Sequence, residues 1–178
     1  MKGIVFTEFI EMVEEKFGFD IADRVIQTSA LPSNGVYTAV GTYSHAEMVS
    51  LLMNLSKEVG MEVDQLLRIF GRHLFEVFTK VYPHFFTGET NLFSFLTQIE
   101  IYIHREVQKL YPDAELPTFT SNYLDDGTFE LVYFSDRRMS ALAEGLITGA
   151  SEFFNTEIDL KTEVFEDGSR VRFLIKMV

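Results

Sequence analysis

Apolar residues recur at spacings of three and four through the first two thirds of the chain, which is the period of an amphipathic α-helix. This pattern predicts helices over residues 3–16, 21–30, 45–59, 63–81 and 91–111. Ser44 and Glu47 have the spacing of a capping box at the start of the third helix. The segment 36–43, between the second and third helices, is interpreted as extended.

The pattern changes after Pro117. Two extended runs between residues 118 and 134 flank Asp125, Asp126 and Gly127, and an Asp-Gly pair suits a tight hairpin turn. A helix returns near Asp136, with Ser135 or Asp136 as its expected cap.

The last residues alternate between apolar and polar from Ile158 to Met177, which predicts a second hairpin with one buried face. The order of elements predicts an α+β fold. In it, a helical N-terminal subdomain precedes an antiparallel four-stranded sheet with a packed helix.

Composition limits the class of partner. The formal net charge of −12 argues against nucleic acids and anionic membrane surfaces, because both attract basic proteins. No apolar window approaches the length of a membrane span, and acidic residues interrupt the N-terminal apolar residues, unlike in a signal peptide. We therefore expect a soluble, cytoplasmic protein that binds proteins or small molecules.

Two features of the composition concern possible sites. The chain has no cysteine, which excludes disulfides, thiolate metal sites and a cysteine nucleophile. Hydrophobic residues make up 47% of the chain, with 18 Phe among them. This surplus suits either a Phe-rich core or a cavity for a large apolar ligand.

One histidine lies beside the apolar stripe of the helix predicted over residues 91–111. At 100° per residue, His104 falls roughly 100° from the centre of that stripe and can face a neighbouring element. A neutral imidazole in this position can bind a metal. A hydrogen-bonded structural histidine fits the same pattern, so the helix alone leaves both interpretations open.

A second candidate site lies where the second strand meets the following helix. Residues two apart in a strand point to the same side, so Tyr133, Ser135 and Arg137 bring a phenol, a hydroxyl and a guanidinium together. Three such donors suit a carboxylate or a phosphate, with Arg137 able to bind it through two hydrogen bonds. A helix cap with a surface salt bridge accounts for the same residues.

Together these features resemble the heme-nitric oxide/oxygen binding (H-NOX) family, which includes the heme domain of soluble guanylate cyclase and stand-alone bacterial gas sensors. The resemblance rests on His104, on Pro117 thirteen residues later, and on Tyr-x-Ser-x-Arg sixteen residues beyond Pro117, in a chain that opens with Met-Lys-Gly. It covers essentially the whole chain. It implies a single domain, 1–178, with a helical subdomain over about 1–64 and heme-cradling helices and sheet over about 65–178.

The resemblance also implies roles for individual residues. His104 is expected to be the proximal ligand of a heme b iron, and hence the metal ligand. Tyr133, Ser135 and Arg137 are expected to hold the heme propionates, and Pro117 to press against the porphyrin and distort it. The residues expected to form the distal pocket are Phe9, Leu74, Phe78, Leu142 and Leu146.

The ligand follows from the same resemblance. Family members that hold oxygen stably use a distal tyrosine hydroxyl, whereas the aligned position here is Leu142 and its partner position is Leu74. We therefore expect a nitric oxide sensor that excludes oxygen, with carbon monoxide as a further ligand. Nitric oxide weakens the opposite axial bond, so His104 release and heme relaxation against Pro117 are expected to signal to a separate histidine kinase or cyclic-di-GMP enzyme.

Several alternatives stay open. Tyr102 and Tyr123 are donors without an assigned place, so an oxygen or redox sensor of the same fold is one alternative, and a heme-free ligand-binding or protein-interaction module is another. His73 is expected on the distal side, as a core residue, a polar group of the pocket or a second axial ligand. No enzymatic activity is expected, because His104 has neither a His-Glu metal motif nor an acid-base partner in sequence.

Overall fold

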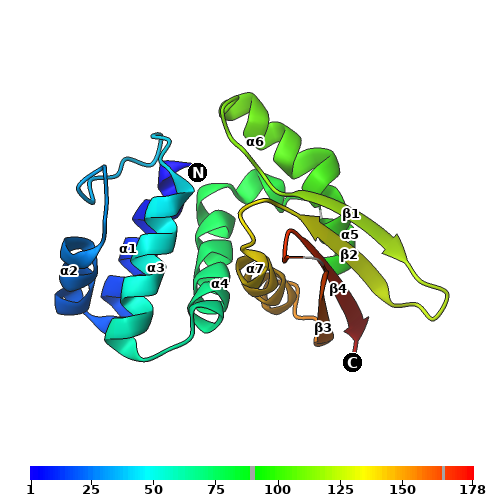
Figure 1. Cartoon of the computed structure of the whole chain (residues 1–178). Coiled ribbons are helices and arrows are strands. Elements are labelled where there is room, and N and C mark those ends of the chain that lie inside the picture. Colours follow the sequence, from blue (N-terminus) through cyan, green and yellow to red (C-terminus); the bar gives the residue numbers. More distant parts are fainter. Residues whose placement is uncertain (89–90, 166) are drawn as a thin grey trace.

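The computed structural model describes residues 1–88, 91–165 and 167–178. Helices on one side of the molecule face a sheet on the other, with two helices packed together between them (Figure 1). The first group is α1 (Gly3–Phe17), α2 (Phe19–Thr28) and α3 (His45–Val59), and the central pair is α4 (Val63–Val81) and α7 (Ser140–Phe153). Helix α2 begins and ends two residues earlier than predicted.

The sheet has the order β1-β2-β4-β3, and every neighbouring pair of strands is antiparallel. Its strands are β1 (Thr118–Tyr123), β2 (Phe129–Phe134), β3 (Ile158–Phe165) and β4 (Arg170–Met177). Alternate residues of the two central strands are buried on one face, as a period of two requires: Phe129, Leu131 and Tyr133 on β2, and Val171, Phe173 and Ile175 on β4. The predicted α+β fold with an antiparallel four-stranded sheet is confirmed.

The helix predicted over residues 91–111 is not uniform. It consists of α5 (Leu92–Gln98), a π-helical turn η2 (Ile99–Ile103) and α6 (His104–Leu110), after a short 3-10 helix η1 (Pro83–Phe85). The backbone amide of His104 bonds to the carbonyl of Ile99, five residues back instead of four. The angle predicted for His104 assumed a constant rotation per residue, and the π-helical turn directly before it does not have the rotation of an α-helix.

Helix α7 begins later than predicted, and the expected cap by Ser135 or Asp136 is wrong. The residue before the helix is Met139, and no side chain caps its first amides. Arg138 has φ of 55°, and its amide donates to the carbonyl of Ser135 at 3.2 Å, so the chain makes a separate turn first. A left-handed residue cannot continue into a right-handed helix, which delays the start of α7.

The capping box expected at Ser44 is only half formed. The Ser44 hydroxyl accepts a hydrogen bond from the amide of Ala46, but the Glu47 side chain does not reach back. Glu47 is buried, and its carboxylate accepts from the amide and hydroxyl of Ser33 and from the hydroxyl of Tyr37. The carboxylate thus holds the loop before α3 instead of the helix terminus.

The expected extended segment 36–43 was also wrong. Its residues form turns and irregular backbone with one isolated bridge, between Thr42 and Lys2. The amides of Gly3 and Ile4, at the start of α1, donate to carbonyls of this segment at 2.8 and 2.9 Å. The segment therefore caps α1 through its backbone instead of joining the sheet.

Helices α4 and α7 approach so closely that glycine is required at their contact. A Cβ atom at Gly145 would lie 2.3 Å from the carbonyl oxygen of Arg68, and a Cβ atom at Gly71 would lie 2.4 Å from that of Leu142. In both cases the obstacle is backbone, which cannot move aside as the end of a side chain can. The separation of these two helices is therefore set by the glycines.

Replacing Gly145 with Ala is expected to lower the free energy of unfolding by about 1–3 kcal/mol, because α4 and α7 must move apart to admit the methyl group. Urea denaturation measures this change. Glu152→Gln is the control, since it removes an exposed ion pair with Arg72 between the same two helices and is expected to cost less than about 1 kcal/mol. Equal stability of the Gly145 variant and the parent would contradict the argument.

Candidate functional site

A largely apolar cavity lies between the start of α1, helices α4 and α7, the α5–η2–α6 segment and the first two strands. It is bordered by two clusters of buried residues, one centred on α1, α3 and α4 and the other on the sheet, α5 and α7. All five residues predicted to bind a cofactor line this cavity: His104, Pro117, Tyr133, Ser135 and Arg137. Residues from three separate segments are thus brought to one place.

His104 enters the cavity wall as the first residue of α6. Its side chain is 16% exposed, and its ring packs 5.8 Å from the ring of Phe119. Burial lowers the pKa of His104 from its ordinary value, so the imidazole is neutral at pH 7. Nδ1 lies 3.1 Å from a carboxylate oxygen of Glu100, which leaves Nε2 as the nitrogen with a free lone pair.

The tyrosine, serine and arginine of the Tyr-x-Ser-x-Arg motif occupy the end of β2 and the turn after it. The Tyr133 ring is buried, its hydroxyl accepts from the amide of Met139 at 3.2 Å, and burial raises the pKa of Tyr133. The Ser135 hydroxyl accepts from the amide of Arg137, also at 3.2 Å. The two hydroxyl groups are also hydrogen-bonded to each other, and either can turn to donate to a ligand.

Arg137 carries the positive charge of this part of the cavity. Its side chain is only 16% exposed, and it donates to Glu115 at 2.8 Å, whose side chain is 86% exposed. An exposed ion pair contributes little stability. A ligand carboxylate reaching the guanidinium from inside the cavity can therefore replace Glu115 at low cost.

The apolar residues predicted for the distal pocket mostly line the same cavity. Leu74 and Phe78 enter it from α4, and Leu142 and Leu146 from α7. Phe9 instead packs in the N-terminal core, where its ring centre is 5.2 Å from that of Phe70.

Several residues of the wall were not found from the sequence. Ile4 and Val5 line the cavity from the start of α1, and Tyr82 and Tyr111 line it from the ends of α4 and α6. Burial raises the pKa of Tyr82 to about 12, and its hydroxyl is hydrogen-bonded to Tyr111. No sequence spacing links Ile4 and Val5 to the two tyrosines, because the residues come from α1 and from the ends of α4 and α6.

The two tyrosines left without a place in the sequence interpretation lie elsewhere. Tyr102 is 42% exposed and packs against Phe85, and Tyr123 is 57% exposed and packs against Phe129. Neither is among the residues that line the cavity. The tyrosine hydroxyl groups inside the wall are those of Tyr82, Tyr111 and Tyr133.

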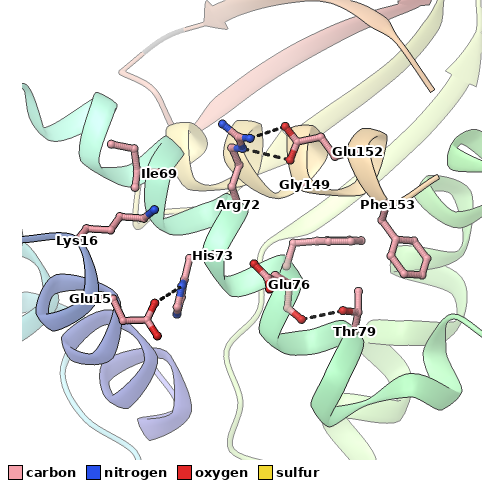
Figure 2. A pocket seen from close by; sticks show the side chains of 11 residues that line it. Glu15, Lys16, Ile69, Arg72, His73, Glu76, Thr79, Gly149, Glu152 and Phe153 are labelled. Carbon is pink, nitrogen blue, oxygen red and sulfur yellow. Dashed lines mark hydrogen bonds and ion pairs between the residues drawn. The ribbon is translucent and has the colours of Figure 1, made fainter. Parts of the chain in front are cut away.

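A second hollow, between α1, α4 and α7, contains His73 (Figure 2). Arg72 bonds to Glu152 at 2.5 Å, and His73 Nδ1 lies 3.9 Å from Glu15. The other ring nitrogen of His73, Nε2, is buried and has no hydrogen-bond partner among the described residues. His73 does not line the cavity that contains His104, so the expectation that it belongs to the distal pocket, there to serve as a polar group or a second axial ligand, was wrong. The side chain points from α4 toward α1, away from that cavity.

Within the described residues, no group of three His, Cys, Asp or Glu side chains is arranged to hold a metal ion. An iron that brings four ligands in its own macrocycle needs only one protein nitrogen, and Nε2 of His104 has the free lone pair that such an iron requires.

No helix among the described residues is both long enough and apolar enough to cross a membrane.

Comparison with known proteins gives one consistent result. A family profile described as Haem-NO-binding matches residues 2–162. The ferrous, unliganded H-NOX protein from K. algicida has 41% identity and a TM-score of 0.94, over 100% of this chain and 97% of that one. A search of curated protein sequences found no match.

Two further structures extend the likeness to ligand-bound proteins. The H-NOX protein from S. oneidensis in its Fe(II)NO state has 26% identity and a TM-score of 0.92, over 100% of this chain and 99% of that one. An oxygen-binding H-NOX domain related to soluble guanylate cyclases, solved as its oxygen complex, has 27% identity and a TM-score of 0.83, over 99% and 95% of the two chains.

The family assignment settles the cofactor and the broad class of function. H-NOX domains bind heme, and the family binds diatomic gases such as nitric oxide and oxygen. The family is one of heme-based sensing, so the expectation that this domain is not an enzyme is confirmed. On the match over residues 2–162 and the likeness to the K. algicida protein, the chain belongs to the Haem-NO-binding (H-NOX) family of heme-based gas sensors.

Proposed function

We propose that this protein is a nitric oxide sensor in which His104 is the proximal ligand of heme b. The observation that carries the proposal is the meeting, in one apolar cavity, of a neutral imidazole, a carboxylate-binding group of donors and an apolar wall from α4 and α7. Heme held there by His104 would supply an iron that can bind a diatomic gas.

Each of the five residues predicted to bind the cofactor suits one part of heme. Nε2 of His104 offers the lone pair for the iron, while Tyr133, Ser135 and Arg137 offer hydroxyl and guanidinium donors for the two propionates. Pro117 precedes β1 directly and puts a rigid ring into the wall near the His104 helix. In this proposal it presses on the macrocycle and keeps it from lying flat.

The apolar side of the cavity supports nitric oxide as the ligand. Bound oxygen carries partial negative charge and needs a hydrogen-bond donor, whereas bound nitric oxide depends on one far less. Leu74 and Leu142 offer no donor, and Leu146 and Phe78 beside them are also apolar. These four apolar side chains leave room for nitric oxide or for oxygen. They provide no hydrogen bond, so they favour the nitric oxide complex, which does not need one.

The proposed signal begins at His104. Heme bound in the cavity would supply the iron that binds the gas, and release of His104 on gas binding would free the imidazole and the helix α6 that carries it. Pro117 would then press less on the macrocycle, and helices α1 to α3 would shift relative to the sheet. A separate histidine kinase or cyclic-di-GMP enzyme reads this shift, through contacts that differ between the two states.

The absorption spectrum of the reduced protein tests the function directly. We expect a Soret band of five-coordinate ferrous heme that does not change in air and that moves to the position of the five-coordinate complex on addition of nitric oxide. Absence of a Soret band after reconstitution with heme would overturn the proposal and favour a heme-free binding module.

The same spectrum tests the alternative of an oxygen sensor, which Tyr82 favours. Its hydroxyl is a protonated donor in the cavity wall. A stable oxygen complex in the parent protein that is lost in Tyr82→Phe would assign oxygen as the ligand and Tyr82 as its donor. We expect no oxygen complex in either protein, because the Tyr82 hydroxyl is engaged with Tyr111.

Arg137→Gln is expected to weaken heme retention by about tenfold or more, since it removes a charged hydrogen bond to a propionate. Arg138→Gln is the matched control: it removes the same charge from the next residue, whose guanidinium is exposed and pairs with Asp167. Heme transfer to apomyoglobin measures both rates. Equal rates in the two variants would show that Arg137 does not hold the cofactor.

A further inference from the structure

The carboxylate of Glu100 connects two parts of the cavity that the chain separates. One of its oxygens, Oε2, lies 3.1 Å from Nδ1 of His104 and also 3.1 Å from the backbone amide of Phe119. The imidazole belongs to α6 and the amide to strand β1, while Glu100 itself lies in the π-helical turn η2. A single oxygen atom thus joins the histidine to the sheet.

The position of strand β1 in the sheet explains why its amide is available. β1 is an edge strand whose only neighbour in the sheet order is β2, so alternate amides of β1 point away from the sheet. The amide of Phe119 donates to Glu100 and not to β2. The Glu100 carboxylate therefore satisfies a backbone donor that the sheet leaves unpaired.

The π-helical turn is the second observation. It ends at Ile103, directly before His104, and the amide of His104 closes it on Ile99. An extra residue in a helical turn strains the helix and persists where it serves a site. Here it carries Glu100 against both the imidazole and β1.

The chemistry of a neutral imidazole gives this contact a consequence. With Nδ1–H donating to a carboxylate, the proton is fixed on Nδ1 and Nε2 keeps its lone pair. An anionic acceptor also draws the Nδ1 proton toward itself and increases the electron density that Nε2 can donate to a metal. The Glu100 side chain then sets the orientation of the His104 ring, its tautomer and its strength as a metal ligand.

We propose that Glu100 is a positioning residue that strengthens the iron–His104 bond and ties the position of His104 to strand β1. The proposal rests on His104 being the proximal ligand. Glu100 sets how readily nitric oxide releases the histidine, and it transmits the movement of the ring to the Phe119 amide, since both share the same oxygen.

The strength of the bond is measured by the iron–histidine stretching frequency in the resonance Raman spectrum of the ferrous protein. We expect the frequency to fall from the parent to Glu100→Gln and to fall further in Glu100→Ala, because a neutral amide oxygen is a weaker acceptor and a methyl group is none. The histidine-released form with nitric oxide should gain about tenfold over the histidine-bound form in Glu100→Ala.

Glu106→Gln is the matched control. Glu106 lies two residues after His104 on the same helix, and its carboxylate pairs with Lys109. The substitution removes the same charge without touching the imidazole, so its frequency should equal that of the parent. A graded fall at position 100 that is absent at position 106 distinguishes a hydrogen-bond effect from loss of negative charge near the iron.

Amide hydrogen exchange tests the link to the strand without reference to gas binding. In Glu100→Ala, exchange at the Phe119 amide is expected to rise by about fivefold, because one hydrogen bond is lost. The amide of Val132, on the adjacent central strand β2, should be unchanged. Equal exchange at Phe119 in the two proteins would overturn the link.

Failure of this inference is separable from failure of the proposed function. A parent protein without a Soret band, or without an iron–histidine mode that His104→Gly removes, would show that His104 is not the ligand. The parent protein can instead show both the Soret band and the iron–histidine mode. If the iron–histidine frequency is then the same in the parent, Glu100→Gln and Glu100→Ala, the proposed sensor function stands and the role of Glu100 is overturned.

Discussion

His104→Gly is expected to abolish the five-coordinate ferrous spectrum of the heme-loaded protein, because no second histidine is among the described residues that line the cavity. Free imidazole diffusing into the space left by the ring should restore the spectrum. The restored protein should no longer respond to nitric oxide, since release of a free ligand moves no helix. Hydrogen exchange over α6 and over α1 to α3, with and without nitric oxide, measures the response.

His73→Gly is the control for this experiment. His73 lies on α4 in the second hollow, outside the cavity that contains His104, so its loss should leave the spectrum and the nitric oxide response intact (Figure 2). Persistence of the parent spectrum in His104→Gly without imidazole would remove His104 as the ligand. A full nitric oxide response in the rescued protein would contradict signalling by histidine release.

Leu142→Tyr should convert the protein into one that holds oxygen. The side chain enters the cavity from α7 beside Leu74, and a phenol there offers the donor that bound oxygen requires. A hydrogen bond to a charged acceptor is worth about 1.5–3 kcal/mol, which corresponds to oxygen dissociation slower by about tenfold to a hundredfold. Stopped-flow measurement of oxygen dissociation checks the value.

Leu142→Phe is the matched control, because it fills the same space without a hydroxyl group. It should hold oxygen no better than the parent. If both variants form a stable oxygen complex, then packing and not hydrogen bonding selects the ligand. If neither does, Leu142 is not close enough to the gas, and the apolar wall is not the reason that oxygen is excluded.

The period of the apolar residues was sufficient to predict most of the fold. Helices α1, α3 and α4 bury one face each, and β2 and β4 alternate, so the pattern along the chain directly reflects the face that is turned to the core. The predictions that failed concern hydrogen bonds and turns that the period of the apolar residues does not encode. Glu47 could not be assigned to Ser33 and Tyr37 from the sequence, and the π-helical turn over Ile99–Ile103 has no signature in the spacing of its apolar residues.

The candidate site shows the same division. The Tyr-x-Ser-x-Arg motif could be found in the sequence because its residues have a fixed spacing. Tyr133, Ser135 and Arg137 lie at the end of one strand and in the turn that follows it. Glu100 was visible as a neighbour of His104 on its helix, but its second partner, the Phe119 amide, was not. Tyr82 and Tyr111 meet only where the ends of α4 and α6 come together.

The sequence by itself determined the class of the fold and the family, and it named candidate residues for the cofactor site, because periodicity and short motifs are properties of a single segment. Only the tertiary structure decided which residues share a cavity. It placed Leu74 and Leu142 in one wall, put His73 outside it and brought Glu100 against β1. The physical reason is that contacts between segments depend on how helices and strands pack, and packing depends on all side chains at once.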